Sequence, residues 1–328
     1  MLNTPDPFVM LAGTLLIVTL LTFSIGFLIN WYRNRTVMVS YKRIGFLAAV
    51  IVAIYELISL ALIASTSFSL GMSAISIVLT VGWLMLRIWA FTNSGIFYSN
   101  KLGLRSFPLV APRLGLLPAP TAETASDPIA SQIVEQPAPE TDTPIGLESA
   151  PPQPIEPASA PGEPIAAEAA PTAPAIHWRN YWLTTLGVGV GALVYSAILF
   201  ALTLPGVGVI FRDVLSSGAN VTPLSLVLVL ELAFTEEIFF RLGIQNYLAA
   251  KLANRRRGYE IAILVTAVLW TLGHAGALDP DWVKLAQVFP IGLALGWLYR
   301  RYGTESAIIA HSLFNLLGGL LLSPLFLR

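Results

Sequence analysis

Three short segments in the C-terminal half place ionisable side chains inside apolar sequence. They are 234-FTEEIFFRLG-243 with Glu236, Glu237 and Arg241, 268-VLWTLGHAGAL-278 with His274, and 307-AIIAHSLFNLL-317 with His311 and Asn315. In each segment two of the residues are four apart and therefore share one helix face: Glu237 with Arg241, Trp270 with His274, and His311 with Asn315.

These residue types suit hydrolysis. A carboxylate beside an imidazole can hold and deprotonate a water, and a second imidazole with a carboxamide can donate hydrogen bonds to a developing oxyanion. Hydrolysis of an amide or ester in this way requires no serine or cysteine nucleophile. The chain has no cysteine, which also excludes disulfides and thiolate metal sites.

The composition indicates a membrane protein. Of the 328 residues, 55% are hydrophobic and only 12% are charged, whereas soluble domains carry about a quarter charged residues. Lys plus Arg and Asp plus Glu are both 19, so the charge balance gives no reason to expect a nucleic-acid partner.

Eight apolar runs are long enough to be membrane spans, which need about 20 residues each. We therefore expect an all-α, polytopic membrane helix bundle with both termini on the same side. The expected spans are 8–30, 44–66, 69–92, 181–205, 223–248, 260–278, 285–300 and 306–327.

A segment of different composition separates spans three and four. Between Pro108 and Pro174 the chain has 16 of its 23 prolines, nine acidic residues against one basic residue, and no aromatic residue. Such a composition predicts a disordered Pro/Ala-rich linker. The predicted organisation is a three-helix membrane module (1–106), the linker (107–178) and a five-helix membrane core (179–328).

Basic residues cluster in alternate loops, and this asymmetry predicts the orientation. They follow spans one, three, five and seven, so the positive-inside rule places the linker in the cytoplasm and both termini outside. We expect a multi-pass protein of the cell membrane.

Charge at membrane depth points to a common site. An ionised side chain at the bilayer centre costs at least ~2.5–3.5 kcal/mol, so the span with Glu236, Glu237 and Arg241 is expected to face a protein interior or a wet cavity. Counting 1.5 Å per residue from the cytoplasmic ends brings Glu236, His274 and His311 within roughly 7 Å of one another in depth.

The motifs EEIFFR, GHAG and HSLFN, in this order on successive spans, resemble the CPBP intramembrane protease family, which includes type II CAAX prenyl proteases and bacterial Abi-type proteins. The resemblance covers about residues 181–328. It implies an intramembrane endopeptidase that cuts a membrane-associated or lipidated protein, as in CAAX processing. The aromatic residue before the histidine departs from the family's FxxxH motif, because it is Trp270.

The resemblance also implies roles for the site residues. Glu236 is expected to activate water with His274, and His311 with Asn315 to form the oxyanion site. Glu237 would assist, and Arg241 would hold the glutamates by an ion pair. Trp270 would line the cavity.

A metal-dependent mechanism is the alternative. Glu236, His274 and His311 could supply a carboxylate and two imidazoles to Zn²⁺, and the family is often labelled metalloprotease. HExxH is absent, however, and using His311 as a ligand is incompatible with its oxyanion role, so we favour a reaction that requires no cofactor.

Two other functions compete with proteolysis. A non-catalytic immunity or scaffold protein could keep the same fold, although it need not retain the whole polar set. A proton-coupled transporter could use the same buried acids and histidines, but the internal repeats typical of transporters are missing from the sequence. At the level of single motifs, the EExxxR charges could be a buried ion-pair network and the histidines interhelical polar contacts.

Overall fold

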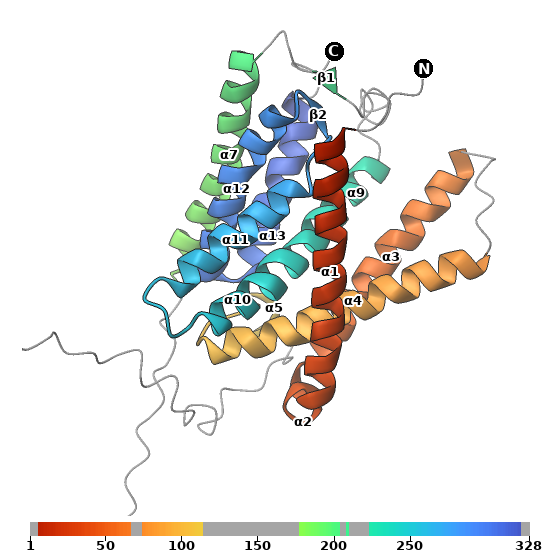
Figure 1. The fold of residues 1–328 in the computed structure, drawn as a ribbon, viewed down its shortest axis with the longest axis vertical. Helices are drawn as coiled ribbons and strands as arrows, with labels where there is room; N and C mark the ends of the chain where they lie inside the picture. Colours follow the sequence, from red (N-terminus) through yellow and green to blue (C-terminus); the bar gives the residue numbers. More distant parts are fainter. Residues whose placement is uncertain (1–5, 67–73, 114–176, 204–207, 210–222, 323–328) are drawn as a thin grey trace, which may run out of the picture. The chain divides into compact units, whose positions relative to one another are not determined.

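A computed structural model describes residues 6–66, 74–113, 177–203, 208–209 and 223–322, and nearly all of them are helical (Figure 1). The N-terminal elements are α1 (Pro7–Arg33), α2 (Arg35–Met38), η1 (Val39–Tyr41), α3 (Lys42–Thr66), α4 (Ala74–Lys101) and α5 (Val110–Arg113). The C-terminal elements are α7 (Trp178–Thr203), α9 (Pro223–Glu236), η4 (Glu237–Gln245), α10 (Asn246–Lys251), α11 (Gly258–Leu272), α12 (Asp281–Tyr302), α13 (Thr304–Leu317) and η5 (Gly318–Leu322).

The predicted all-α membrane bundle is confirmed. Within the described residues, four helices are long and apolar enough to cross a membrane: Pro7–Arg33, Ile77–Lys101, Trp178–Thr203 and Asp281–Tyr302. Gly258–Leu272 is a shorter apolar helix. The count of eight spans stays a prediction, and parts of the third, fourth and eighth expected spans (69–73, 204–205 and 323–327) lie outside the described residues.

One short antiparallel pair interrupts the helices. Strand β1 (Gly208–Val209) pairs with β2 (Leu278–Asp279), with Gly208 opposite Asp279 and Val209 opposite Leu278. The pair joins the segment after α7 to the segment between α11 and α12. It is the only sheet among the described residues.

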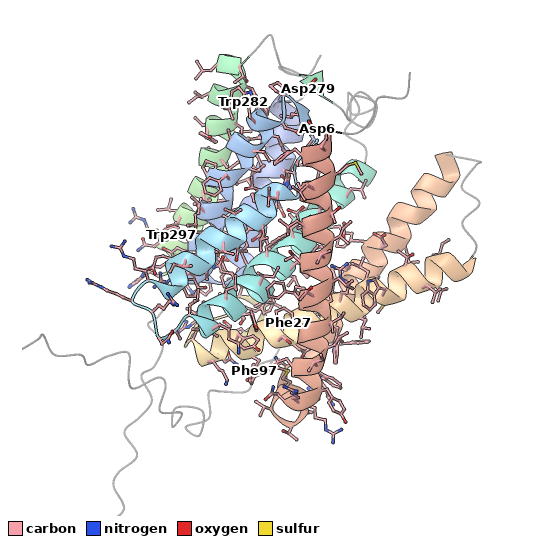
Figure 2. The ribbon with its side chains drawn as sticks, viewed as in Figure 1. Asp6, Phe27, Phe97, Asp279, Trp282 and Trp297 are labelled. Carbon is pink, nitrogen blue, oxygen red and sulfur yellow. The ribbon has the colours of Figure 1, made fainter. Side chains whose placement is uncertain are left out.

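The helices on both sides of the linker share one hydrophobic core. That core contains Phe27 and Phe91 from α1 and α4 together with Ile238 and Leu295 from η4 and α12, and Figure 2 shows Phe27 where α1 passes over α4. The described residues of the N-terminal and C-terminal parts therefore form one compact unit. The linker prediction falls mostly outside the described residues, on 114–176.

Side chains on the outer surface of α12 are apolar and exposed. Trp282 and Trp297 are 56% and 48% exposed, and both project outward in Figure 2. Tryptophans in such positions suit a helix that meets lipid on one side. Gly292 and Gly296 of the same helix are buried.

The expected span 223–248 is a continuous helical run whose middle is a π-helix. Helix α9 passes directly into η4, in which nine residues from Glu237 to Gln245 have π-helical hydrogen bonding, and then into α10. π-Helical turns are rare and occur frequently at functional sites. All nine residues of η4 are buried.

The expected span 260–278 is shorter in the structure, and this corrects the boundary. Helix α11 ends at Leu272, so His274 lies in the following turn instead of inside the helix. Gly273 and Gly276 explain the early end, because Gly276 has φ +82°, a left-handed conformation that glycine adopts without strain.

The turn between α12 and α13 forms hydrogen bonds with residues 106–110, which follow α4. The Thr304 backbone N–H donates to the Ser106 carbonyl (2.8 Å), and the Glu305 carboxylate accepts from the backbone N–H groups of Leu109 (2.5 Å) and Val110 (2.7 Å). Gly303 makes this approach possible. It has φ +89°, and a Cβ there would lie 2.6 Å from the Arg105 carbonyl oxygen.

We predict that Gly303→Ala lowers the free energy of unfolding by at least about 1 kcal/mol, because alanine is strained at positive φ and its methyl group would collide with the docked segment. Thermal unfolding in detergent measures the effect. Gly187→Ala in α7 is the matched control, because a Cβ at Gly187 meets no atom within 4 Å. Equal melting temperatures for the two variants would contradict the prediction.

Candidate active site

The candidate site residues come from four neighbouring elements. Glu236 is the last residue of α9 and Glu237 the first of η4, Trp270 lies in the last turns of α11, and His311 lies in α13. The structure brings these four residues into mutual contact. His274 joins them from the turn after α11.

Glu236 is fixed by an indole. The Trp270 Nε1–H donates to Glu236 Oε2 at 2.5 Å. The side chain of Glu236 keeps 17% of its surface exposed, whereas Trp270 is 1% exposed. The buried indole N–H of Trp270 therefore orients the Glu236 carboxylate, which remains partly exposed to solvent.

His274 is oriented by the backbone of the same tryptophan. Its Nδ1 lies 2.9 Å from the Trp270 carbonyl oxygen, and a carbonyl can only accept, so Nδ1 carries the proton and donates it. The neutral ring then has its lone pair on Nε2. The two rings lie 4.8 Å apart between centroids at 70°, an edge-on contact.

Glu237 and His311 form a hydrogen-bonded pair that is buried from solvent and lies next to Glu236. His311 Nδ1 lies 2.8 Å from Glu237 Oε1, and the carboxylate accepts from it. The exposed fractions of the two side chains are 0% for Glu237 and 3% for His311. The other nitrogen of the ring, Nε2, lies 3.9 Å from Glu236 Oε2, so His311 connects the two glutamates.

Arg241 neutralises the buried glutamate. Its Nε lies 3.4 Å from Glu237 Oε2, and both side chains are excluded from solvent. Its Nη2 donates to the Gly292 carbonyl (3.4 Å), and its guanidinium lies 4.6 Å from the Trp270 ring centroid. The ion pair that the sequence assigned to both glutamates is seen with Glu237. Glu236 is held by Trp270 instead.

Two further polar residues of this helical run, Gln245 and Asn246, also face the interior, as expected for the charged part of the span. Gln245 Nε2 donates to the Gly296 carbonyl (3.1 Å). Asn246 donates to the Tyr299 hydroxyl and to the Gly95 carbonyl. Both side chains are fully buried.

Asn315 lies one turn beyond His311 in α13 and is half-buried. Its side chain makes no hydrogen bond to another described residue, so its oxyanion role stays a prediction. Shared position on one face of α13 still directs it toward the side of the helix that carries His311.

Sequence reasoning missed two contributions to the site. Trp270 was expected to line a cavity, and its hydrogen bond to Glu236 was not foreseen. Lys284 falls just before the expected span 285–300 and belongs to no motif, yet in α12 it lies close enough for its charge to act on Glu236 and His274. A lysine at the start of an apolar helix was the only signal available in the sequence.

The residues suggested for zinc do not converge as a ligand set. Among the described residues, no group of three or more His, Cys, Asp or Glu side chains is arranged to hold a metal ion. Glu236 Oε2 accepts from Trp270, and His311 Nδ1 is bonded to Glu237. The hydrogen bonds of His274 and His311 engage Nδ1 and leave Nε2 of each ring available, so the reaction without a cofactor stays a prediction.

Comparison with known proteins gives one match. Residues 218–317 match the family model described as Type II CAAX prenyl endopeptidase Rce1-like, which is 100 of the chain's 328 residues. No curated protein and no solved structure matches the chain. The matched segment runs from just before α9 to the end of α13 and contains every candidate site residue. Over these residues the chain is similar to the Rce1-like family of type II CAAX prenyl endopeptidases.

Proposed function

We propose that the chain is an intramembrane endopeptidase that hydrolyses a peptide bond in a membrane-associated or lipidated protein, as in CAAX processing. The family match supports this class of reaction. The observation that carries the proposal is the arrangement of a partly exposed Glu236 and two oriented imidazoles around the Trp270 indole.

Glu236 is the proposed water activator. Its Oε2 is engaged by Trp270, which leaves Oε1 to accept a hydrogen bond from water on the exposed side. His274 supports the same water, because its Nε2 lone pair is an acceptor once Nδ1 donates to the Trp270 carbonyl. Two acceptors orient the water so that an oxygen lone pair faces the substrate carbonyl carbon.

His311 is the proposed oxyanion donor together with Asn315. The buried Glu237 carboxylate accepts from Nδ1 and stabilises a positive charge on the ring, while Arg241 balances Glu237 from its other oxygen. A protonated His311 presents Nε2–H toward the site beside Glu236. Donors held in this way in a water-poor interior stabilise a developing negative charge strongly.

The steps balance without another reactant. The water oxygen bonds to the substrate carbonyl carbon while Glu236 takes one of its protons. The resulting oxyanion is stabilised by His311 and Asn315, and its collapse breaks the carbon–nitrogen bond. Glu236 then passes the proton to the leaving amine, so the products are a new carboxyl terminus and a new amino terminus.

We also propose that this reaction proceeds without a metal ion. It is supported by the arrangement of the side chains, because among the described residues no group of three or more His, Cys, Asp or Glu side chains is placed to hold a metal ion. The chemistry assigned above uses the hydrogen bonds of Glu236, His274 and His311 and needs no Lewis acid.

The proposed orientation places the linker in the cytoplasm and both termini outside. It is supported by the gathering of basic residues at one end of the bundle. Arg300 pairs with Glu260 (2.7 Å) at the start of α11, next to the exposed Arg255–Arg257, and the segment that follows Lys101 is docked beside it on the α12–α13 turn. Positive-inside asymmetry assigns this end to the cytoplasm.

We predict that Glu236→Ala abolishes cleavage of a quenched fluorogenic peptide that ends in a farnesylated CAAX sequence. Loss of the water activator should lower kcat by about 10²–10⁴-fold, measured with protein purified in detergent. Glu231→Ala is the matched control, because Glu231 lies on the same helix and is bonded to Thr235. Full activity of a folded Glu236→Ala variant would refute the mechanism. A chain whose Glu236, His274 and His311 variants all keep cellular function would be a scaffold.

Trp270→Phe should keep the fold and lower kcat by about tenfold with little change in KM, because the aromatic ring remains while the N–H that aims Glu236 is lost. Steady-state kinetics on the same peptide separate the two constants. An unchanged kcat would mean that the indole hydrogen bond does not position the catalytic carboxylate.

Metal removal should leave the activity unchanged. The purified protein is dialysed against a strong chelator and assayed on the same peptide, and its zinc content is measured by plasma mass spectrometry. Loss of activity that returns on addition of Zn²⁺, with one zinc ion bound per active chain, would overturn the metal-free proposal and leave the endopeptidase proposal intact.

A further inference from the structure

Helix α4 lies outside the family-matched segment and carries an unexplained charge. Arg87 lies near the middle of the candidate membrane span Ile77–Lys101. It is half-buried, and among the described residues no carboxylate lies within salt-bridge distance of it. Charged residues at such depth usually serve a function.

Arg87 contacts both α1 and η4, the π-helix that follows Glu236. Its Nε donates to Ser24 Oγ of α1 (3.2 Å), and its guanidinium carbon lies 4.8 Å from the ring centroid of Phe239 in η4. Phe91, one turn further along α4, meets the same ring edge-on at 4.7 Å. The ring of Phe239 is thus held by two side chains of α4, three residues after Glu236.

The backbone of α4 continues this contact. A Cβ on Gly95 would lie 2.5 Å from the Leu242 carbonyl oxygen, so the two helices touch backbone to backbone. The Gly95 carbonyl accepts from Asn246 Nδ2 at 3.3 Å. Helix α4 therefore lies against Phe239, Leu242 and Asn246 in succession.

The helical run from Glu236 to Asn246 thus packs on two sets of neighbours. Glu237, Arg241 and Gln245 bond to α12 and α13, whereas Phe239 and Leu242 meet α4. Asn246 bonds to both sides, to Tyr299 of α12 and Gly95 of α4. A π-helix of nine residues is unusual, since most π-helical segments are single turns. Packing on two opposite sides is what keeps such a segment in place.

We propose that α4 is a positioning element of the candidate active site, and that Arg87 is a positioning residue that acts through Phe239 on Glu236 and Glu237. The inference rests on the proposed function for its catalytic readout. It assigns to the N-terminal helices a share in building the site, although the family-matched segment does not include them.

Arg87→Met tests the proposal with the farnesylated CAAX peptide. We expect kcat to fall by about tenfold and KM to stay within about twofold, because the variant misplaces the catalytic groups and does not remove a substrate contact. Arg87→Lys should recover part of the loss. Leu86→Ala is the matched control, because Leu86 is the neighbouring, exposed position on the same helix.

A double-mutant cycle with Phe239→Leu identifies the route. If Arg87 acts through Phe239, then Arg87→Met should have little further effect in the Phe239→Leu background. Additive losses, or a kcat for Arg87→Met equal to that of the control, would overturn the proposal. Full activity of Glu236→Ala would instead count against the proposed function.

Hydrogen exchange provides a readout that does not need a substrate. In the intact protein, Arg87→Met should speed amide exchange in residues 237–245 and leave α13 unchanged, whereas Leu86→Ala should change neither. Exchange in residues 237–245 equal to that of the wild type would show that Arg87 does not support the catalytic helix, whatever the peptide assay gives.

Discussion

The candidate site depends on the Trp270 indole. One side chain donates to Glu236, lies under the Arg241 guanidinium and contacts the rings of His274 and His311, and its carbonyl orients His274. A hydrogen bond that aims a carboxylate is strong only where water cannot compete. The near-complete burial of Trp270 meets that condition, so a single residue fixes both groups proposed to hold the water.

Burial separates the ionisable groups into two kinds. Glu237, Arg241 and His311 are sealed, and the Glu237 carboxylate lies within salt-bridge distance of both Arg241 and His311. Glu236 keeps an exposed edge, and His274 is half-buried. Removing a charge from the sealed set leaves an uncompensated partner in the interior, whereas the open pair can exchange protons with a bound water. The adjacent glutamates Glu236 and Glu237 therefore meet different neighbours, because Glu236 ends α9 and Glu237 begins the π-helix.

Much of this arrangement could be predicted from the sequence, and particular residues show where prediction stopped. Four-residue spacing and apolar runs indicated the helices and brought Glu237, Arg241 and His311 to one site. The end of α11 before His274 depends on the backbone of Gly276, and the π-helix leaves no distinctive pattern of apolar residues. Trp270 was judged by its size because its N–H matters only beside Glu236. Arg87 and Lys284 belong to no motif, so their places became visible only through their neighbours in space.

The compact unit is larger than the segment that matches the family model. Residues 218–317 supply every catalytic candidate, but only one side of η4 is covered by elements of that segment. The other side meets α4 through Phe91, Gly95 and Arg87, and without that cover the buried amide of Asn246 would lose its Gly95 acceptor. Lipid offers no hydrogen bond to replace it. Because Asn246 bonds to Tyr299 of α12 and to Gly95 of α4, this helix requires protein on both sides, and in this chain the N-terminal helices provide the second side.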